Sequence, residues 1–252
     1  MKYLALLVLL AGTLTGYAQD DPDERYRQSQ KTEVWTPVPP QIMPGWQLGQ
    51  PPEDAVILFD GNNLDHFESS KKPGAAAPWT LGFHQFTVKP GSGDIQTRQG
   101  FQDVQLHLEW KSPIDTTGLE GQARGNSGVF FQGLYEVQIL DNYNNPTYSN
   151  GQAGSIYKQY IPTVNPIRPP GEWNAYDIIF MAPRFKKDGT VQTPGTLTVI
   201  FNGVVVQYHK ELLGETVWIG EPSYKAHADK LPIKFQDHGN PVSYRNIWLR
   251  EL

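Results

Sequence analysis

The chain has 252 residues, a net charge of −5 at neutral pH and no cysteine. Its length and its hydrophobic fraction of 38% allow one sizeable core. The acidic balance and the lack of a long basic run argue against a nucleic-acid partner, and the lack of cysteine excludes disulfides and thiolate metal sites. With 24 glycines and 21 prolines, the composition favours a loop-rich β protein over a helical one.

The first residues have the pattern of an export signal. Lys2 is followed by an apolar run and then by the small-residue site Gly16-Tyr17-Ala18. We therefore expect a signal peptide at 1–18 and an exported protein, periplasmic or extracellular. A membrane anchor is the alternative, but the apolar run is short for the roughly 20 residues that span a bilayer. No other segment approaches that length, so we expect no stable membrane insertion after cleavage.

Residues 19–52 are polar and rich in proline and lack a sustained hydrophobic period. This composition predicts an extended N-terminal arm leading into the domain. No segment of the chain has a convincing helical pattern, and we expect a short turn at most in 212–218.

From residue 55 onward the sequence is dominated by strand signals. Residues 104–110 alternate cleanly between apolar and polar side chains, and Asn202-Gly203 is a strong hairpin turn because both residues tolerate positive φ. The expected strands are 55–59, 104–110, 176–183, 196–201, 204–209, 233–236 and 246–252, together with two short strands around Gly133-Leu134. Many short strands joined by turns predict an all-β domain, either two packed antiparallel sheets or a barrel, at 53–252.

One strand carries a candidate site. Glu136 and Gln138 are two residues apart, so their side chains share one face, and apolar side chains occupy the other. That polar face is either a solvated sheet surface or the floor of a binding cleft. Asp141, at the end of this strand, either caps the loop or joins the site. The long segment 141–173 that follows is rich in tyrosine and amides, so we expect an ordered wall of a binding site.

A second polar cluster, Gln236-Asp237-His238, ends a later strand. Turn chemistry explains most of its residue types but explains His238 least well. Arg124 is either a surface charge or a group held over the Glu136 face, and Lys158 is either solvated or in reach of a ligand.

His107 and Glu109 share a polar strand face, which we expect to be exposed surface. The familiar nucleophile, zinc-protease, phosphate-loop and dinucleotide motifs are missing, so we expect no nucleotide cofactor. An oxygen-rich site with one histidine would suit a hard divalent cation.

Several blocks together are similar to one bacterial family. They are LFDGNNLDHF (58–67), GNSGVFFQGLYEVQILDNY (125–143), GSIYKQY (154–160), RPPGEWNAYDIIF (168–180), FNG (201–203) and IKFQDHGNPVSYRNIWLREL (233–252). In this order they resemble the 3-keto-disaccharide hydrolase family, formerly a domain of unknown function, over roughly 53–252. His66-Phe67 departs from the Gly-Trp that members often carry. The resemblance implies a concanavalin A-like jelly-roll sandwich in an exported protein that acts on carbohydrate.

The resemblance also implies a substrate with a glucose ring oxidised at C3. The ketone acidifies the C2 proton, so a base can remove it, the C1 substituent leaves by elimination and water adds to the product. This chemistry needs one base and a group that stabilises an oxyanion, for which a divalent cation would serve.

On this basis Glu136 and His238 are the expected catalytic pair, each acting as general base or metal ligand. The side chains expected to orient substrate, water or metal are Gln138, Asp141, Gln236 and Asp237. Arg124 is expected to stabilise the oxyanion or bind a hydroxyl, and Asn126, Tyr157 and Lys158 are expected to line the pocket.

Two other functions remain open for the same fold. A non-catalytic carbohydrate-binding module would use the polar face for sugar hydroxyls and need no base. A conventional endo-glucanase would resemble a Glu-x-Asp-x-x-Glu strand, but here the middle carboxylate is Gln138 and Asp141 has the wrong parity. A surface or adhesion protein is a more distant possibility.

Overall fold

The structure is a computed structural model that describes residues 22–252, so the expected signal peptide at 1–18 lies outside the described residues. The chain divides into a unit that ends at Gln41 and a compact unit Ile42–Leu252. Among the described residues, no helix is long and apolar enough to span a membrane. The compact unit starts within the expected arm, because residues 42–52 belong to it.

The described part of the N-terminal unit contains one α-helix, α1 (Pro22–Gln30), so the prediction that no segment is helical was wrong. Pro22 begins the helix, and Asp23 and Glu24 place negative charge in its first turn, where the helix dipole favours it. Arg27 donates to Glu24 at 3.2 Å along the helix surface. No residue of α1 is buried, which is why the segment lacks the apolar period by which helices are found in sequences.

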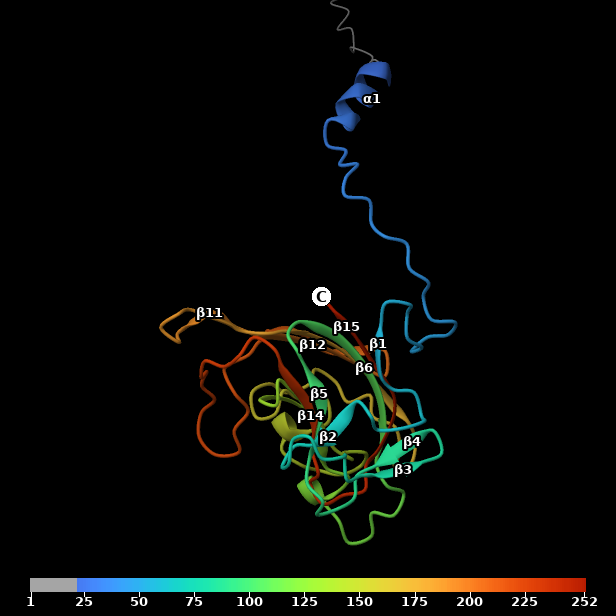
Figure 1. The fold of residues 1–252 in the computed structure, drawn as a ribbon, viewed down its shortest axis with the longest axis vertical. Helices are drawn as coiled ribbons and strands as arrows, with labels where there is room; N and C mark the ends of the chain where they lie inside the picture. The colour runs from blue at the N-terminus through green and yellow to red at the C-terminus, as the bar shows by residue number, and fades with distance from the viewer. Residues whose placement is uncertain (1–21) are drawn as a thin grey trace, which may run out of the picture. The chain divides into compact units, whose positions relative to one another are not determined.

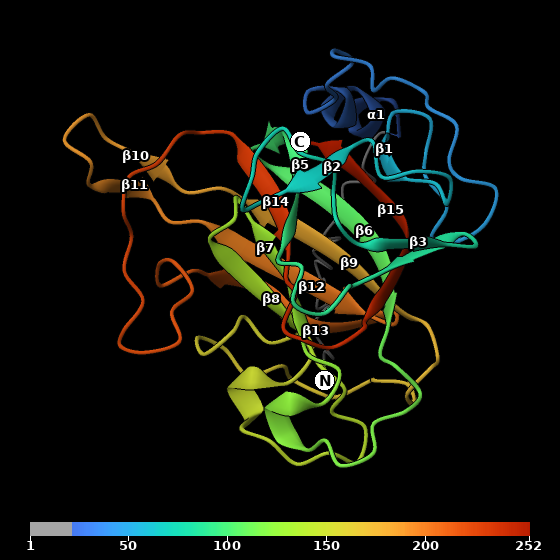
Figure 2. The same ribbon diagram turned by 60° about the horizontal axis from the view of Figure 1, so that its bottom comes forward.

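The compact unit is built from two antiparallel sheets, as the sequence predicted (Figure 1, Figure 2). The eight-stranded sheet has the order β13-β12-β9-β6-β15-β4-β3, and β1 also pairs with β15. Its strands are β1 (Val56–Phe59), β3 (Thr80–Gly82), β4 (Gln85–Thr87), β6 (Val104–Lys111), β9 (Asn174–Met181), β12 (Thr196–Phe201), β13 (Val204–Glu211) and β15 (Ser243–Glu251).

The five-stranded sheet has the order β2-β5-β14-β7-β8. Its strands are β2 (Phe67–Ser69), β5 (Ile95–Phe101), β7 (Ser127–Phe131), β8 (Tyr135–Ile139) and β14 (Leu231–Phe235). A separate pair, β10 (Arg184–Phe185) and β11 (Val191–Thr193), forms a small projecting hairpin. Two short 3₁₀ helices, Gly121–Ala123 and Ser149–Gly151, lie in the loops before β7 and after β8.

Turn chemistry and strand alternation account for the central strands. Asn202 and Gly203 have φ of 50° and 80°, which is the two-residue turn that joins β12 to β13. Along β6, Leu106 and Leu108 point into the space between the sheets and are fully buried.

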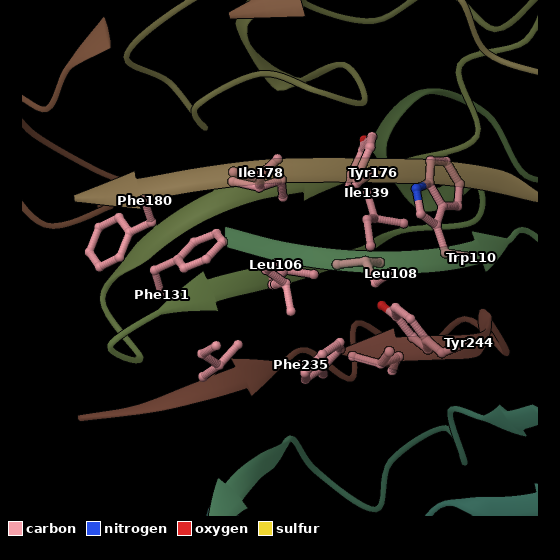
Figure 3. Close-up of a cluster of buried hydrophobic side chains, with 14 of the residues drawn as sticks. Leu106, Leu108, Trp110, Phe131, Ile139, Tyr176, Ile178, Phe180, Phe235 and Tyr244 are labelled. Atoms are coloured by element: carbon pink, nitrogen blue, oxygen red, sulfur yellow. The ribbon is translucent and has the colours of Figure 1, made fainter. Parts of the chain in front are cut away.

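The core between the sheets is rich in aromatic side chains. Figure 3 shows Leu106, Leu108 and Trp110 of β6 beside Tyr176, Ile178 and Phe180 of β9, with Phe131, Ile139 and Phe235 contributed by the five-stranded sheet. Phe131 stacks on Phe180 with ring centroids 4.8 Å apart. A core this continuous fixes the inward face of each strand, so the outward faces of the two sheets are left for polar side chains.

The outward face of the eight-stranded sheet carries a buried polar cluster, which corrects the expectation of exposed surface for His107 and Glu109. His107 is only 2% exposed. The segment 42–52 covers this face, since the carbonyl oxygen of Gly49 accepts hydrogen bonds from Asn246 at 2.8 Å and from the indole of Trp248 at 2.9 Å. The indole of Trp248 also stacks on His107, with ring centroids 5.2 Å apart.

Candidate active site

A cleft of about 590 Å³ lies on the outward face of the five-stranded sheet. Its size falls in the range typical of small-molecule sites. Its lining consists of Gln122, Asn126, Phe130, Glu136, Gln138, Tyr148, Tyr157, Thr216, Trp218, Gln236 and His238. The cleft therefore brings together both expected catalytic residues and four of the expected binding residues, which are Asn126, Gln138, Tyr157 and Gln236.

Strand register explains why these side chains meet. In β7 and β8, Phe130 pairs with Glu136 and Gly128 pairs with Gln138. On the other side of β7, Lys234 of β14 pairs with Phe130, and the backbone N–H of Gln236 donates to the carbonyl of Gly128 at 3.0 Å. Directly opposed residues point to the same face of a sheet, so Lys234, Phe130 and Glu136 form one row across three strands.

Glu136 is an unpaired buried carboxyl group. The residue is 4% exposed, and its carboxyl group makes no hydrogen bond to any residue in 22–252. Burial raises its pKa to about 8, the nearby Lys234 charge lowers the pKa in part, and Asp94 raises it. At neutral pH this group is therefore mostly protonated, and once it ionises it is a stronger base than an ordinary carboxylate.

Gly128 provides the space for this carboxyl group. A Cβ atom added at Gly128 would lie 2.5 Å from Oε1 of Glu136 and 3.0 Å from the ring of Phe130. Any larger residue would push the Glu136 side chain out of its position. Gly128, the second glycine of GNSG, thus has a steric role that its turn-like sequence context does not reveal.

An amide network fixes the floor beside Glu136. Gln138 donates to Oε1 of Gln122 at 3.2 Å, and Asn126 donates to the carbonyl of Gln122 at 2.7 Å. Gln122 in turn donates to Thr147 and to the carbonyl of Gly151. In contrast, Oε1 of Gln236 is buried and has no partner among the described residues, so it is an acceptor available to a bound hydroxyl.

The segment after β8 forms a wall of the cleft, as expected for an ordered loop. It pairs with the open edge of β8, because the Gln138 N–H donates to the backbone carbonyl of Ser155 and the Tyr157 N–H donates to the backbone carbonyl of Glu136. The hydroxyls of Tyr148 and Tyr157 are 2.7 Å apart. Burial raises the pKa of Tyr157 well above its usual value, so its hydroxyl remains a proton donor at neutral pH.

Five lining residues were not identified from the sequence: Gln122, Phe130, Tyr148, Thr216 and Trp218. Thr216 is placed by two hydrogen bonds, one from the Glu136 N–H to its Oγ1 at 2.9 Å and one from its own N–H to the Leu134 carbonyl. Trp218 exposes 73% of its surface. A lone tryptophan in a glycine-rich loop was the available signal for this part of the wall.

Four of the expected site residues do not line the cleft. Arg124 and Asp141 pair with each other, with Nε to Oδ2 at 2.9 Å, and Asp141 is completely buried. Asp237 accepts from the N–H groups of Gly93 at 2.8 Å and Gly239 at 3.0 Å, so its carboxylate holds turns together. Lys158 lines an adjoining cavity. These contacts place Arg124, Asp141 and Asp237 in the supporting structure of the site.

The cleft contains Glu136 and His238, the two residues that were expected to bind a divalent cation. Among residues 22–252, no group of three or more histidine or acidic side chains is arranged to hold a metal ion. The cleft lining offers one carboxyl group, one imidazole and several amides. This set does not match the carboxylate-rich ligation of hard cations, so we derive the chemistry of the site without a metal.

A cleft that holds a buried carboxyl group between aromatic and amide side chains suits a carbohydrate, whose rings have apolar C–H faces and polar hydroxyls. Comparison with known proteins identifies the family. Residues 54–250 match the family described as the 3-keto-alpha-glucoside-1,2-lyase-like domain, and the chain belongs to this family. No curated protein matches the chain.

Solved structures agree with this assignment. A candidate glycosyl hydrolase from Parabacteroides distasonis ATCC 8503 is 53% identical, with a TM-score of 0.84, and the match covers 94% of this chain and 99% of that one. A second candidate glycosyl hydrolase from the same organism is 21% identical, with a TM-score of 0.59, over 79% of this chain and 94% of that one. The second likeness shows the fold alone. The family and the first of these structures together support an enzyme that acts on glycosidic bonds.

Proposed function

We propose that the protein cleaves 3-keto-glucosides, including 3-keto-disaccharides, by removing the C2 proton and eliminating the C1 substituent. The observation that carries this proposal is the unpaired, buried carboxyl group of Glu136, whose pKa is raised to about 8, on the floor of the cleft. A carbon-bound proton next to a ketone requires a strong base. A carboxylate that is poorly solvated and lacks hydrogen bonds is such a base.

Glu136 takes the proton from C2, and the electron pair of the C–H bond becomes an enolate shared with the C3 oxygen. The enolate then re-forms the C3 ketone and a C1=C2 double bond while the C1–O bond breaks. The leaving oxygen takes a proton from His238, which lines the same cleft from the turn after β14. Hydration returns a proton to C2 and adds hydroxide to C1, which gives the free 3-keto-sugar.

One neutral donor and one neutral acceptor in the cleft would hold the substrate during this step. The Tyr157 hydroxyl stays protonated because burial raises its pKa, and the amide of Gln236 lines the cleft with its oxygen unpartnered. We propose that the Tyr157 hydroxyl donates a hydrogen bond to the enolate oxygen. Gln236 Oε1 then accepts a hydrogen bond from a substrate hydroxyl. Donors held in a partly water-excluded site stabilise a developing charge more strongly than water does.

The composition of the cleft also supports elimination over the usual double displacement. Conventional glycosidases use two carboxyl groups on either side of the scissile bond. Among the described residues that line the cleft, Glu136 is the one carboxylic acid. The family description, a 3-keto-alpha-glucoside-1,2-lyase-like domain, agrees with an elimination between C1 and C2.

The test compares a 3-keto-glucoside with its unoxidised parent in D₂O. We expect release of the leaving group from the keto sugar alone, with deuterium at C2 of the product and of recovered substrate. We expect Glu136→Gln to abolish both release and exchange. Release of sugar from the unoxidised parent would instead indicate a conventional glycosidase, and binding of sugar without any release would indicate a carbohydrate-binding module.

The same assay tests whether the enzyme requires a divalent cation and whether its final product is the hydrated or the unsaturated sugar. Cleavage that persists after treatment with a chelator agrees with the donor set of the cleft, and cleavage that is lost and then restored by a divalent cation shows a metal requirement. Detection of the unsaturated keto sugar as the final product would make the enzyme a lyase, and detection of the 3-keto-sugar would make it a hydrolase. Export through the signal peptide at 1–18 remains part of the proposal and is tested by sequencing the N-terminus of the mature protein.

A further inference from the structure

A second cavity adjoins the cleft, and nothing in the proposed reaction has used it. It has a volume of about 360 Å³. It shares Tyr148, Tyr157 and Trp218 with the cleft, so these three aromatic side chains stand between the two spaces. Its own lining is Asn150, Lys158, Gln159, Val217, Gly220, Glu221 and Pro222. The Glu136 carboxyl group, by contrast, belongs to the cleft.

The walls of this cavity are held in place by hydrogen bonds between two loops. The Lys158 ammonium donates to the carbonyl of Trp218 at 2.6 Å. Gln159 donates to the carbonyl of Gly214 at 3.0 Å and accepts from the N–H of Leu213 at 2.8 Å. The two loops therefore form one tied unit, and the position of Trp218 does not depend on a ligand to fix its backbone.

Two features of this tied unit suit it to bind a ligand. Trp218 leaves 73% of its surface in water although its backbone is anchored. Lys158 adopts φ of 59°, a left-handed conformation that is unfavourable for a residue with a Cβ atom. The ammonium group of Lys158 lies 5.8 Å from the centre of each of the Tyr148 and Tyr157 rings. One of the three ammonium protons is used by Trp218, so the others are available to a hydroxyl.

The chemistry of this lining identifies the ligand class. An exposed indole offers an apolar face for stacking, and an ammonium, a carboxylate and two amides offer donors and acceptors around it. A pyranose ring has the same division, with C–H groups on its faces and hydroxyls on its edge. The C1 substituent of a sugar bound over Glu136 must also leave the cleft through a neighbouring space.

We propose that this cavity is the leaving-group subsite, that it binds the second sugar ring of a disaccharide, and that stacking on Trp218 sets the preference for a disaccharide over a glycoside with a small leaving group. The proposal rests on the proposed function for the position of the first ring. It adds the class of the leaving group, which the cleft by itself does not specify.

The experiment measures kcat/KM for a 3-keto-disaccharide with a glucose leaving group and for a methyl 3-keto-glucoside. The ratio of the two values in each variant is divided by the ratio in the wild type, which cancels the intrinsic difference between the leaving groups. We expect Trp218→Ala to lower this selectivity by about tenfold, mainly through KM, because a stacking contact accounts for a difference of that order. Lys158→Met should lower it in the same direction by about threefold.

Ile219→Ala is the matched control, because Ile219 is 77% exposed in the same loop and lines neither cavity. It should leave the selectivity unchanged. A Trp218→Ala variant that loses the same factor on both substrates, or on neither, would overturn the proposal. Equal losses in the Ile219 and Trp218 variants would assign the effect to the fold of the loop, which also overturns it.

A binding measurement separates the failure of this proposal from the failure of the proposed function. Calorimetry on Glu136→Gln should show tighter binding of an unoxidised disaccharide than of the methyl glucoside, and adding Trp218→Ala should remove the difference. If wild-type enzyme leaves keto substrates intact while this preference is present, the chemistry is wrong and the subsite stands. If keto substrates are cleaved and no preference is found, the subsite is wrong and the chemistry stands.

Discussion

The outward faces of the two sheets carry acidic side chains in the same strand pattern but in opposite electrostatic environments. On the eight-stranded sheet, Asp177 contacts Nδ1 of His107 at 2.7 Å, and Arg245 donates to Glu109 at 2.6 Å. Burial alone would lower the pKa of His107, but Asp177 and Glu109 raise it to about 9. Burial opposes ionisation of Glu109 as well, and its bonds to His107, Asn246 and Arg245 outweigh that effect and lower its pKa to about 2.

On the five-stranded sheet, Glu136 is more deeply buried than Glu109 and has no such partners, so burial raises its pKa to about 8. A carboxylate that is paired is held in its charged form and is a poor base, whereas an unpaired one is held near the midpoint of its titration. Deep burial without a partner at Glu136, in contrast to shallower burial with partners at Glu109, separates the reactive face from the structural face of this molecule.

The largest expected effect comes from replacing the unpaired acid. Glu136→Gln should lower kcat on a 3-keto-glucoside by at least about 10³-fold, because a general base is removed. The folded-state pKa lies above the unfolded value, so ionisation costs stability increasingly from pH 4.5 to 8. The variant should therefore be more stable than wild type at pH 7, by up to about 3 kcal/mol, and similar at pH 4. Chemical denaturation at both pH values measures this, and a fully active variant would contradict the assignment.

Removing a member of the ion-paired cluster on the eight-stranded sheet should lower stability and leave activity unchanged, the reverse of the Glu136 variant. His107→Gln should leave kcat unchanged in folded protein and lower the free energy of unfolding by about 2 to 3 kcal/mol at pH 6. The folded pKa of about 9 exceeds the reference of 6.5, so this contribution is present below pH 6.5 and is lost as pH rises through 9. Denaturation curves of the variant and wild type should differ at pH 6 and converge at pH 9.5. A variant with normal stability and reduced turnover would reverse the roles of the two faces.

The sequence predicted the polar strand face and the core strands because both depend on local patterns. The two-residue spacing of Glu136 and Gln138 sets their shared face in any strand. The Asn202-Gly203 turn likewise encodes its own geometry, and the resemblance placed the blocks in a sandwich. None of these inferences required knowledge of a contact between distant segments.

The failures of sequence reasoning arise from distant contacts. His107 is buried because Asp177 and the segment 42–52 meet it from elsewhere in the chain. Arg124 and Asp141 were expected in the site, but they form an ion pair with each other, and the sequence does not indicate this contact. Trp218 enters the site through hydrogen bonds between two loops about 60 residues apart, a placement that no local pattern encodes.

A smaller effect should follow from filling the space under the unpaired acid. Gly128→Ala places a Cβ atom 2.5 Å from Oε1 of Glu136, so we expect the carboxyl group to shift and kcat to fall by about 10- to 100-fold. Gly82→Ala is the control, because its Cβ atom would make only ordinary contacts of 3.5 Å or more. Steady-state kinetics and thermal melts distinguish misplacement from unfolding. Normal kcat in a folded Gly128→Ala variant would show that the position of the Glu136 carboxyl group does not limit the reaction.

The smallest expected effect tests how the surrounding charges adjust Glu136. Activity should rise with pH as Glu136 ionises, with a midpoint near its pKa of about 8. Lys234 lowers this pKa and Asp94 raises it, so Lys234→Met should move the midpoint up and Asp94→Asn should move it down, each by a fraction of a pH unit. Lys187→Met, at an exposed position outside the cleft, should leave the midpoint in place. Opposite shifts from two charges that do not line the cleft would identify the rising limb as the titration of Glu136. Shifts of one sign, or none, would assign that limb to another group.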